Sequence, residues 1–281
     1  MYIGFDLKTA TSHIVNKRMV EIGKGDFDDK KKKVEAELED FLNDDRSIDG
    51  TALQTTWFPS IDADVFISHS HNDLEQAYEL AGFLKHNFGL KVFLDSCVWG
   101  SADGLLKEID DKYCEHPTNT GSYSYEARNF STSHVHMMLS AAIHTMIDKS
   151  ECLFFLNTPN SISAKDVINQ QTKSPWIYAE ILMSQLVRRE KPCRVPQKVL
   201  LEKSAKPKLQ LDINYKLDMR HLAPLKYEDL LTWQKVYEKS IPSSEVIGVV
   251  NSGGTVSRHD FAEMHALDVL YRQQNLIETN R

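Results

Sequence analysis

The residues of this chain best suited to catalysis or ligand binding are a tryptophan and a glutamate four residues apart, Trp176 and Glu180. Ser174 is a good N-cap residue and Pro175 suits the first helical position, so a helix is predicted to begin there. Residues four apart lie one above the other on a helix face. This pair suits a flat, positively charged aromatic ligand, because the indole can stack on it and the carboxylate can stabilise developing positive charge. A structural interpretation stays open, in which Trp176 packs in the core and Glu180 is solvated.

The elements that would position this pair alternate between strands and helices. Short apolar runs bounded by turn residues predict buried strands at 64–68, 91–95 and 152–157. A single apolar stripe predicts a helix over 74–88, which Gly89 is expected to end. A strand, a helix and a strand within about thirty residues form a βαβ unit, which implies a parallel sheet. The alternation therefore predicts an α/β fold with a flavodoxin-like doubly wound parallel sheet.

The rest of the chain adds helices and one uncertain strand position. A long polar loop is expected over 116–133, followed by a helix with an apolar face over 135–147. A last strand is expected at either 198–201 or 213–217. A further helix is expected over 261–277.

Polar residues follow three of the predicted strands, at the edge where open parallel sheets bind ligands. The first group begins at Ser68 and His69, the second begins at Asp95 and contains Trp99, and the third begins at Asn157. The first group suits an anion, because hydroxyls and backbone amides gather there at a helix start. The chain has neither a glycine-rich dinucleotide fingerprint nor a P-loop sequence, so a phosphate-bearing ligand would be held in another way.

Composition and charge limit the partners. A net charge of −7 argues against a general nucleic-acid binder, which needs a basic face. No run of about 18 apolar residues and no signal-peptide pattern occurs, so we expect no membrane partner and a cytoplasmic location. The four scattered cysteines indicate reduced thiols. His69 and His71 could converge in an extended segment, but no acidic or cysteine partner lies at ligand spacing, so no metal is expected.

These residues resemble the Toll/interleukin-1 receptor (TIR) domain family, in particular its bacterial enzymatic branch. The matches are the first strand with its Ser-His-Ser ending at 64–70, the second strand at 91–95, and the Trp176 and Glu180 pair on the family's fourth helix. The overall build resembles the signal-producing TIR proteins of Thoeris-type anti-phage systems. We expect a TIR domain over 63–240. An N-terminal helical extension over 1–62 and a C-terminal helical extension over 241–281 are expected to flank it, and both depart from a compact TIR domain.

The resemblance implies cleavage of the nicotinamide–ribose bond of NAD, which is then a substrate and not a cofactor. Glu180 would be the catalytic carboxylate, because the departure of nicotinamide leaves positive charge on the ribose. The side chains expected to bind substrate are Trp176, Phe66, Ser68, His69, Asp95, Trp99 and Asn157. The product, a cyclic ADP-ribose isomer or an ADP-ribose conjugate, would act as a signal that activates a separate effector protein in anti-phage defence.

The resemblance also implies self-association through the TIR domain. The loop from Ser96 to Asp103 corresponds to the family's BB loop, which closes over a neighbour's pocket, and an exposed Trp99 is expected to take part. Two other function classes stay open. A non-catalytic TIR interaction module shares the fold and the loop, so the fold does not exclude it. A nucleoside deoxyribosyltransferase-like enzyme also sets a glutamate against a sugar. The carboxylate of Glu180 favours the NAD-cleaving enzyme over the interaction module.

Overall fold

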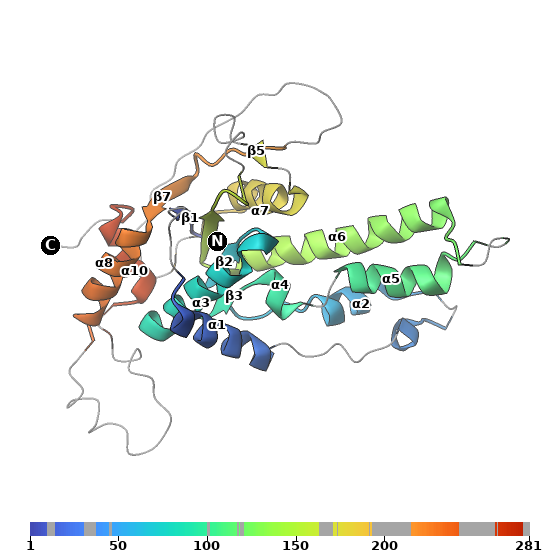
Figure 1. Ribbon diagram of the computed structural model, residues 1–281, viewed down its shortest axis with the longest axis horizontal. Coiled ribbons are helices and arrows are strands. Elements are labelled where there is room, and N and C mark those ends of the chain that lie inside the picture. Colours follow the sequence, from blue (N-terminus) through green and yellow to red (C-terminus); the bar gives the residue numbers. More distant parts are fainter. Residues whose placement is uncertain are drawn as a thin grey trace, which may run out of the picture.

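The computed structural model describes residues 1–9, 15–30, 38–44, 47–99, 102–116, 118, 121–162, 171–172, 174–190, 192, 215–241, 262 and 264–277. Its centre is a sheet of five parallel strands (Figure 1). The strands follow the order β3 (Val92–Phe93), β2 (Val65–Ser68), β4 (Cys152–Asn157), β1 (Ile3–Lys8) and β7 (Leu222–Lys226). The predicted α/β class is therefore confirmed, and three of these strands lie where the sequence placed them.

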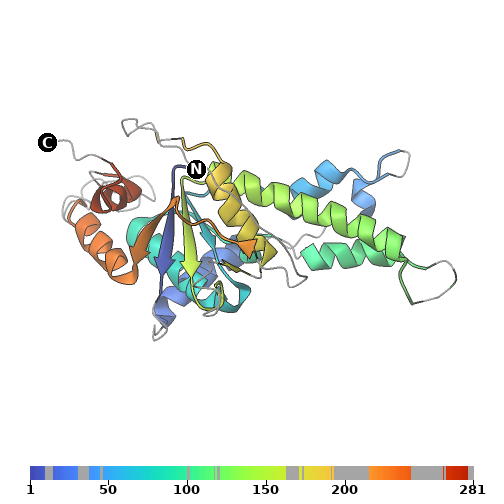
Figure 2. The ribbon, with the colours of Figure 1, turned by 90° about the horizontal axis from the view of Figure 1, so that it is seen from above.

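Helices surround the sheet and extend beyond it. They are α1 (Lys17–Lys30), α2 (Gly50–Trp57), α3 (Leu74–Phe88), α4 (Asp95–Val98), α5 (Ala102–Tyr113), α6 (Tyr125–Lys149), α7 (Pro175–Leu186), α8 (Tyr227–Glu238) and α10 (Ala266–Gln273), with short 3₁₀ turns at Leu38–Phe41 and His71–Asp73. Figures 1 and 2 show that α2, α5 and α6 form an arm that points away from the sheet. None of the helices within the described ranges is long and apolar enough to cross a membrane.

The alternation of side chains along the strands separates two faces of the sheet. On one face, Phe5 of β1 lies 5.3 Å from Phe154 of β4, measured between ring centroids, and stacks on Tyr271 of α10. Phe154 also stacks with Trp233 of α8. Helices α8 and α10 therefore cover this face. Ser68 of β2 points to the other face, where it contacts α7. Both faces of the strands are buried, which explains their nearly continuous apolar runs.

The ends of the helices follow from capping residues. Helix α3 spans the predicted residues and ends at Gly89, whose φ of 69° is in the left-handed region that glycine adopts without strain. Helix α6 begins at Tyr125 and not near residue 135, because the Ser124 side chain caps it by accepting from the Ala127 N–H. The expected polar loop at 116–133 is therefore shorter than predicted.

The first residues of the chain belong to the sheet, so the expected helical extension over 1–62 is wrong. The segment Ile3–Lys8 pairs with β4 along one side and with β7 along the other. Of the two expected positions for the last strand, 213–217 contains β6 (Tyr215–Lys216), which pairs only with β5 (Gln171–Thr172), and 198–201 lies outside the described residues. Because α10 packs on β1, this C-terminal helix belongs to the same body as the sheet.

Two glycines allow α1 and α3 to cross closely. A Cβ atom on Gly82 of α3 would lie 1.9 Å from the carbonyl oxygen of Met19, and one on Gly23 of α1 would lie 2.1 Å from that of Tyr78. Both distances are shorter than any real contact, and both neighbours are rigid backbone. Only glycine at both positions therefore permits this approach. The close crossing fixes where α1 packs on α3.

We expect Gly82→Ala to lower the free energy of unfolding by about 1–3 kcal/mol or more, because the two helices must separate. Gly25→Ala is the matched control, since nothing lies within 4 Å of a Cβ atom at Gly25 in the same pair of helices. That change should stabilise α1 by up to about 1 kcal/mol through helix propensity. Urea denaturation measures both. Equal effects of the two substitutions would contradict the close crossing.

Candidate functional site

Helix α7 begins as the sequence predicts. The Ser174 side chain accepts a hydrogen bond of 3.3 Å from the backbone N–H of Ile177, and Pro175 occupies the first turn. Trp176 and Glu180 therefore lie one helical turn apart. Their surroundings differ, because Glu180 is 3% exposed whereas Trp176 is half-buried. The interpretation of Glu180 as a solvated helix residue is thus excluded.

The carboxylate of Glu180 meets the end of strand β2. The hydroxyl of Ser68, the last residue of that strand, donates a hydrogen bond of 2.5 Å to Oε2 of Glu180. Both side chains are buried. The contact places Glu180 at the carboxyl edge of the parallel sheet, which is the usual ligand-binding edge of such folds. Two residues that the sequence assigned to the site are therefore in direct contact.

A second carboxylate, that of Asp95, acts on Glu180. Burial raises the pKa of Glu180 well above its ordinary value, the negative charge of Asp95 raises it further, and the hydrogen bond from Ser68 lowers it. Asp95 is the first residue of α4 and accepts a hydrogen bond of 2.7 Å from the Ser96 N–H. Two carboxyl groups that interact in this way do not readily both ionise. In this arrangement Glu180 favours the protonated form.

His69 closes the same side of the site. It is buried, its Nδ1 lies 3.4 Å from the carbonyl oxygen of Ile67, and its Nε2 lies 3.3 Å from the hydroxyl of Ser96. Burial lowers the pKa of His69, while the charge of Asp95 opposes this shift. His71 is exposed, with its ring centroid 6.4 Å from that of His69. His69 therefore serves as a neutral group that links β2 to α4.

A further carboxylate, Asp6, lies in the same row of the sheet and was missed by the sequence analysis. Asp6 and Ser68 are both paired in register with Phe155, so all three side chains point to the α7 face. Asn157 donates a hydrogen bond of 2.7 Å to Asp6, and burial raises the pKa of Asp6. The apolar run around Asp6 could have predicted this strand, because it has the same short, apolar character as the run before Ser68.

The loop after β4 is tied to the start of α3 by a separate polar group. Thr158 donates a hydrogen bond of 2.5 Å to the carboxylate of Asp73, and the side-chain amide of Asn160 donates one of 2.7 Å to its other oxygen. Asp73 and Thr158 are buried. These bonds fix the segment that follows Ser68 and so help to position the site.

Two residues expected to bind substrate lie in the core. Phe66 is buried, with its ring centroid 5.3 Å from that of Phe93. Trp99 is 5% exposed, donates a hydrogen bond of 2.9 Å to the Pro59 carbonyl and packs edge-on against Phe58. The expectation of an exposed Trp99 was therefore wrong. In the loop expected over 96–103, residues 100 and 101 lie outside the described residues.

Trp176 occupies an intermediate position. Its ring lies 5.5 Å from the ring of His136 on α6, at an interplanar angle of 88°. It packs against the core with one side and remains half-buried. This contact joins α7 to the arm, at the end of the helix that also carries Glu180.

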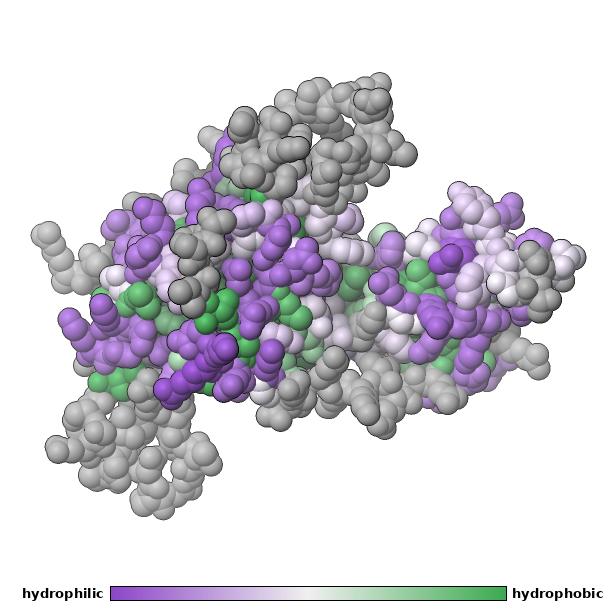
Figure 3. Space-filling view, viewed as in Figure 1, coloured by the Kyte–Doolittle hydropathy of each residue, from purple (hydrophilic) through white to green (hydrophobic). Residues whose placement is uncertain are grey.

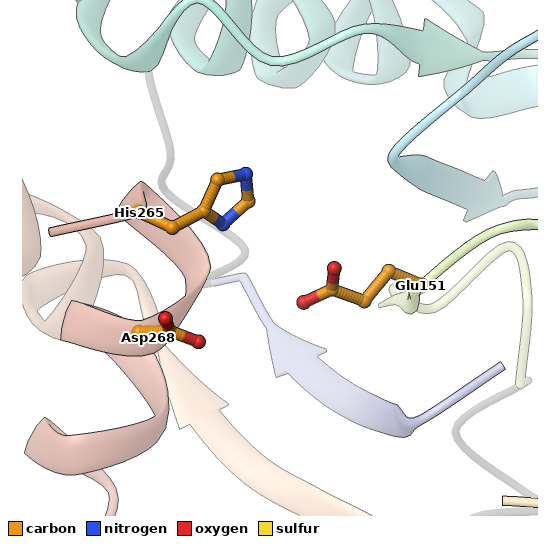
Figure 4. A group of neighbouring side chains, drawn as sticks. All are labelled: Glu151, His265 and Asp268. Atoms are coloured by element: carbon orange, nitrogen blue, oxygen red, sulfur yellow. The ribbon is translucent and has the colours of Figure 1, made fainter. Parts of the chain in front are cut away.

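One group of side chains away from this site could hold a metal ion. The ligand atoms of Glu151, His265 and Asp268 lie within 4.8 Å of one another and point into a common space (Figure 4). Imidazole and carboxylate ligands of this kind suit a divalent transition metal. Glu151 precedes β4, so the group lies at the edge of the sheet opposite Glu180. Tyr271 donates a hydrogen bond of 2.9 Å to Glu151, which already gives that carboxylate a structural role.

Comparisons with protein-family models, with curated proteins and with solved structures found no match to this chain. The arguments on function therefore depend on the residues and their geometry.

The two tryptophans near the site should respond differently to truncation. Trp99→Ala removes a buried ring and its hydrogen bond to Pro59, and should lower the free energy of unfolding by about 3–5 kcal/mol. Trp176→Ala removes a half-buried ring and should cost roughly half of that or less. Urea denaturation of both variants under one condition gives the comparison. A loss for Trp176→Ala as large as that for Trp99→Ala would make Trp176 a core anchor.

Glu180 should make the stability of the chain depend on pH. Burial and the charge of Asp95 raise the pKa of Glu180 in the folded state above its ordinary value of 4.5, so folding favours the protonated carboxyl. This stabilising contribution is complete below about pH 4.5 and is lost as the pH rises toward the folded pKa. Glu180→Gln keeps the shape without the charge. It should raise the melting temperature at about pH 8 and change it little at about pH 4.5.

The matched control for this measurement is Glu108→Gln, the same substitution at an exposed position of α5. Its effect on the melting temperature should not grow with pH. If Glu180→Gln and Glu108→Gln show the same pH dependence, Glu180 does not hold its proton in the folded chain.

Proposed function

We propose that this chain is a TIR-domain enzyme that cleaves the nicotinamide–ribose bond of NAD. The observation that carries the proposal is the contact of Glu180 with Ser68 beside Asp95, at the carboxyl edge of a parallel sheet. That edge is where open α/β sheets bind ligands. The proposal needs no resident cofactor, because NAD is the substrate.

In the proposed reaction, the bond from nicotinamide to the ribose C1 breaks, nicotinamide leaves as a neutral molecule, and positive charge develops on C1 and the ring oxygen. A nitrogen of the adenine or a second small molecule then forms a bond to C1 and loses a proton to water, which gives the cyclic isomer or the conjugate. Ionised Glu180 stabilises this charge and accepts hydrogen bonds from the ribose hydroxyls. Ser68 positions the carboxylate, since it already donates to Oε2. The half-buried Trp176, one turn earlier on α7, offers a ring on which nicotinamide or adenine can stack.

The strand order both supports and limits the resemblance to the TIR family. In a flavodoxin-like sheet the first three strands of the domain lie in the order 2-1-3. Strands β3, β2 and β4 have this arrangement. The fourth place in such a sheet belongs to the next strand along the chain, whereas here the N-terminal β1 fills it. The finer assignment to a TIR fold is therefore part of the proposal, with β1 as a departure from the family pattern.

The burial of Glu180 implies that the site opens before it reacts. At 3% exposure the carboxylate is out of reach of a molecule as large as NAD. Helix α4 is only four residues long and carries Asp95 at its start, so we infer that its displacement exposes Glu180 and takes Asp95 away from it. Self-association through the loop after α4 supplies the binding energy for this opening. The released ADP-ribose derivative then acts as a signal for a separate effector protein in anti-phage defence.

The direct test is incubation of the purified chain with NAD, followed by mass spectrometry of the products over a series of protein concentrations. The wild type should release nicotinamide, with a specific activity that rises with protein concentration. Glu180→Gln should lose about 10²-fold or more of this rate, because the charge that meets the transition state is gone. Glu108→Gln, exposed on α5, should leave the rate unchanged.

The low exposure of Glu180 also favours a second candidate, a TIR-like interaction module without catalysis. In that case the Ser68 and Glu180 contact only holds α7 on the sheet. A folded wild type that releases no nicotinamide at any concentration would support this candidate. NAD cleavage at an equal rate by Glu180→Gln would remove Glu180 from the mechanism.

A further inference from the structure

A cavity of about 240 Å³ lies on the face of the sheet opposite Glu180. Its floor is formed by Leu7 of β1 and Leu156 of β4, and its walls come from α1, α3 and α8. Figure 3 shows hydrophobic residues that reach the surface among hydrophilic ones over these three helices. None of the residues that line the cavity belongs to the group around Glu180, so the two places are separate.

The position of the cavity is one at which α/β folds bind ligands. It lies at the carboxyl ends of the adjacent strands β1 and β4. After β1 the chain continues into α1, which packs on α3, whereas after β4 it continues into α7 on the opposite face. A crevice opens between two adjacent strands whose connections leave to opposite faces, and ligands bind preferentially in such a crevice.

Two polar residues of α3, Gln76 and Glu79, are among the residues that line this largely apolar space. Glu79 of α3 is 4% exposed. Its carboxylate accepts a hydrogen bond of 2.9 Å from the Asn16 N–H and another from the Tyr227 hydroxyl. One turn earlier, Oε1 of Gln76 is buried and has no hydrogen-bond partner among the described residues. A buried acceptor without a donor is costly, so a donor supplied by a ligand would be favoured.

Apolar side chains from the same helix, α3, and from α8 form much of the remaining lining, and the charge among the described lining residues is of one sign. Leu80 and Phe83 of α3 and Leu230 of α8 line the space. The described lining residues include no lysine, arginine or histidine, and Glu79 is their one carboxylate. Such a space disfavours phosphates and carboxylic acids, and it suits an apolar ring with hydrogen-bond donors at one end.

We propose that this cavity binds a small ring compound that carries amino or amidino groups. The ring packs between the leucines and Phe83, and its N–H groups donate to Glu79 and Gln76. Asn87 and Gln234 hold the wall in place, because the Gln234 amide donates a hydrogen bond of 3.1 Å to Asn87 and so joins α8 to α3. The site is independent of the proposed NAD chemistry.

Three probes of nearly identical shape test the proposal on the full chain: benzamidine, which is cationic, benzamide, which is neutral, and benzoate, which is anionic. Binding is followed by two-dimensional NMR, in which the side-chain amides of Asn87 and Gln234 report the location. We expect saturable shifts of these signals by benzamidine, weaker ones by benzamide and none by benzoate. No saturable shift with benzamidine, or equal shifts with benzoate, would overturn the proposal.

Two variants separate the site from adventitious binding. Glu79→Gln should weaken benzamidine binding by about tenfold or more, because the charge-assisted hydrogen bond is lost. Gln76→Leu provides a second test if Glu79→Gln does not fold, since it removes the side-chain amide whose oxygen has no hydrogen-bond partner among the described residues. It should also weaken benzamidine binding, while Glu108→Gln on α5 should not. Unchanged benzamidine binding in folded Gln76→Leu and Glu79→Gln would overturn the proposal.

Discussion

The backbone pairing of β1 is the constraint on which the sheet depends. Ile3–Lys8 is paired along its length with β4, and its residues from Gly4 onward are paired with β7. Within the described part of the chain, β7 has no other neighbour in this sheet. The first residues of the chain therefore connect the βαβ portion to its C-terminal portion, and α8 follows directly from β7. Removal of this strand would separate the two sides and expose unpaired backbone groups on both.

The same strand supplies residues to both faces of the sheet. Asp6 points to the α7 face, in one row with Ser68, while Leu7 forms the floor of the cavity on the other face. Helices cover both faces, so polar side chains at the carboxyl edge are removed from water and must find partners. Ser68 with Glu180 and Asn157 with Asp6 are such pairs. The buried polar groups of this edge are therefore a consequence of the parallel architecture. The same groups make this edge suitable for ligand binding or catalysis.

Local patterns in the sequence were sufficient for the elements around the site. Apolar runs located β2, β3 and β4, and capping residues located the start of α7, so the approach of Ser68 to Glu180 could be predicted from the topology of a parallel sheet. The place of β1 could not be predicted, because pairing with distant strands leaves no local periodicity. The burial of Trp99 depends in the same way on Phe58 and Pro59. The early part of α6 lies on the arm away from the sheet, so it lacks the apolar stripe that marks core helices.

In the proposed reaction, the burial of Glu180 affects both the access of the substrate and the ionisation of the Glu180 carboxyl group. In the closed arrangement, burial and the charge of Asp95 raise the pKa of Glu180, which shifts the group that should stabilise positive charge toward its neutral form. Movement of α4 would admit water and take Asp95 away, because Asp95 is the first residue of that helix. Both effects lower the pKa of Glu180. A single motion would therefore admit the substrate and ionise the carboxylate, and the closed chain would be inactive for two reasons at once. If the chain cleaves NAD as proposed, this restraint would keep it inactive until assembly provides the energy to open the site.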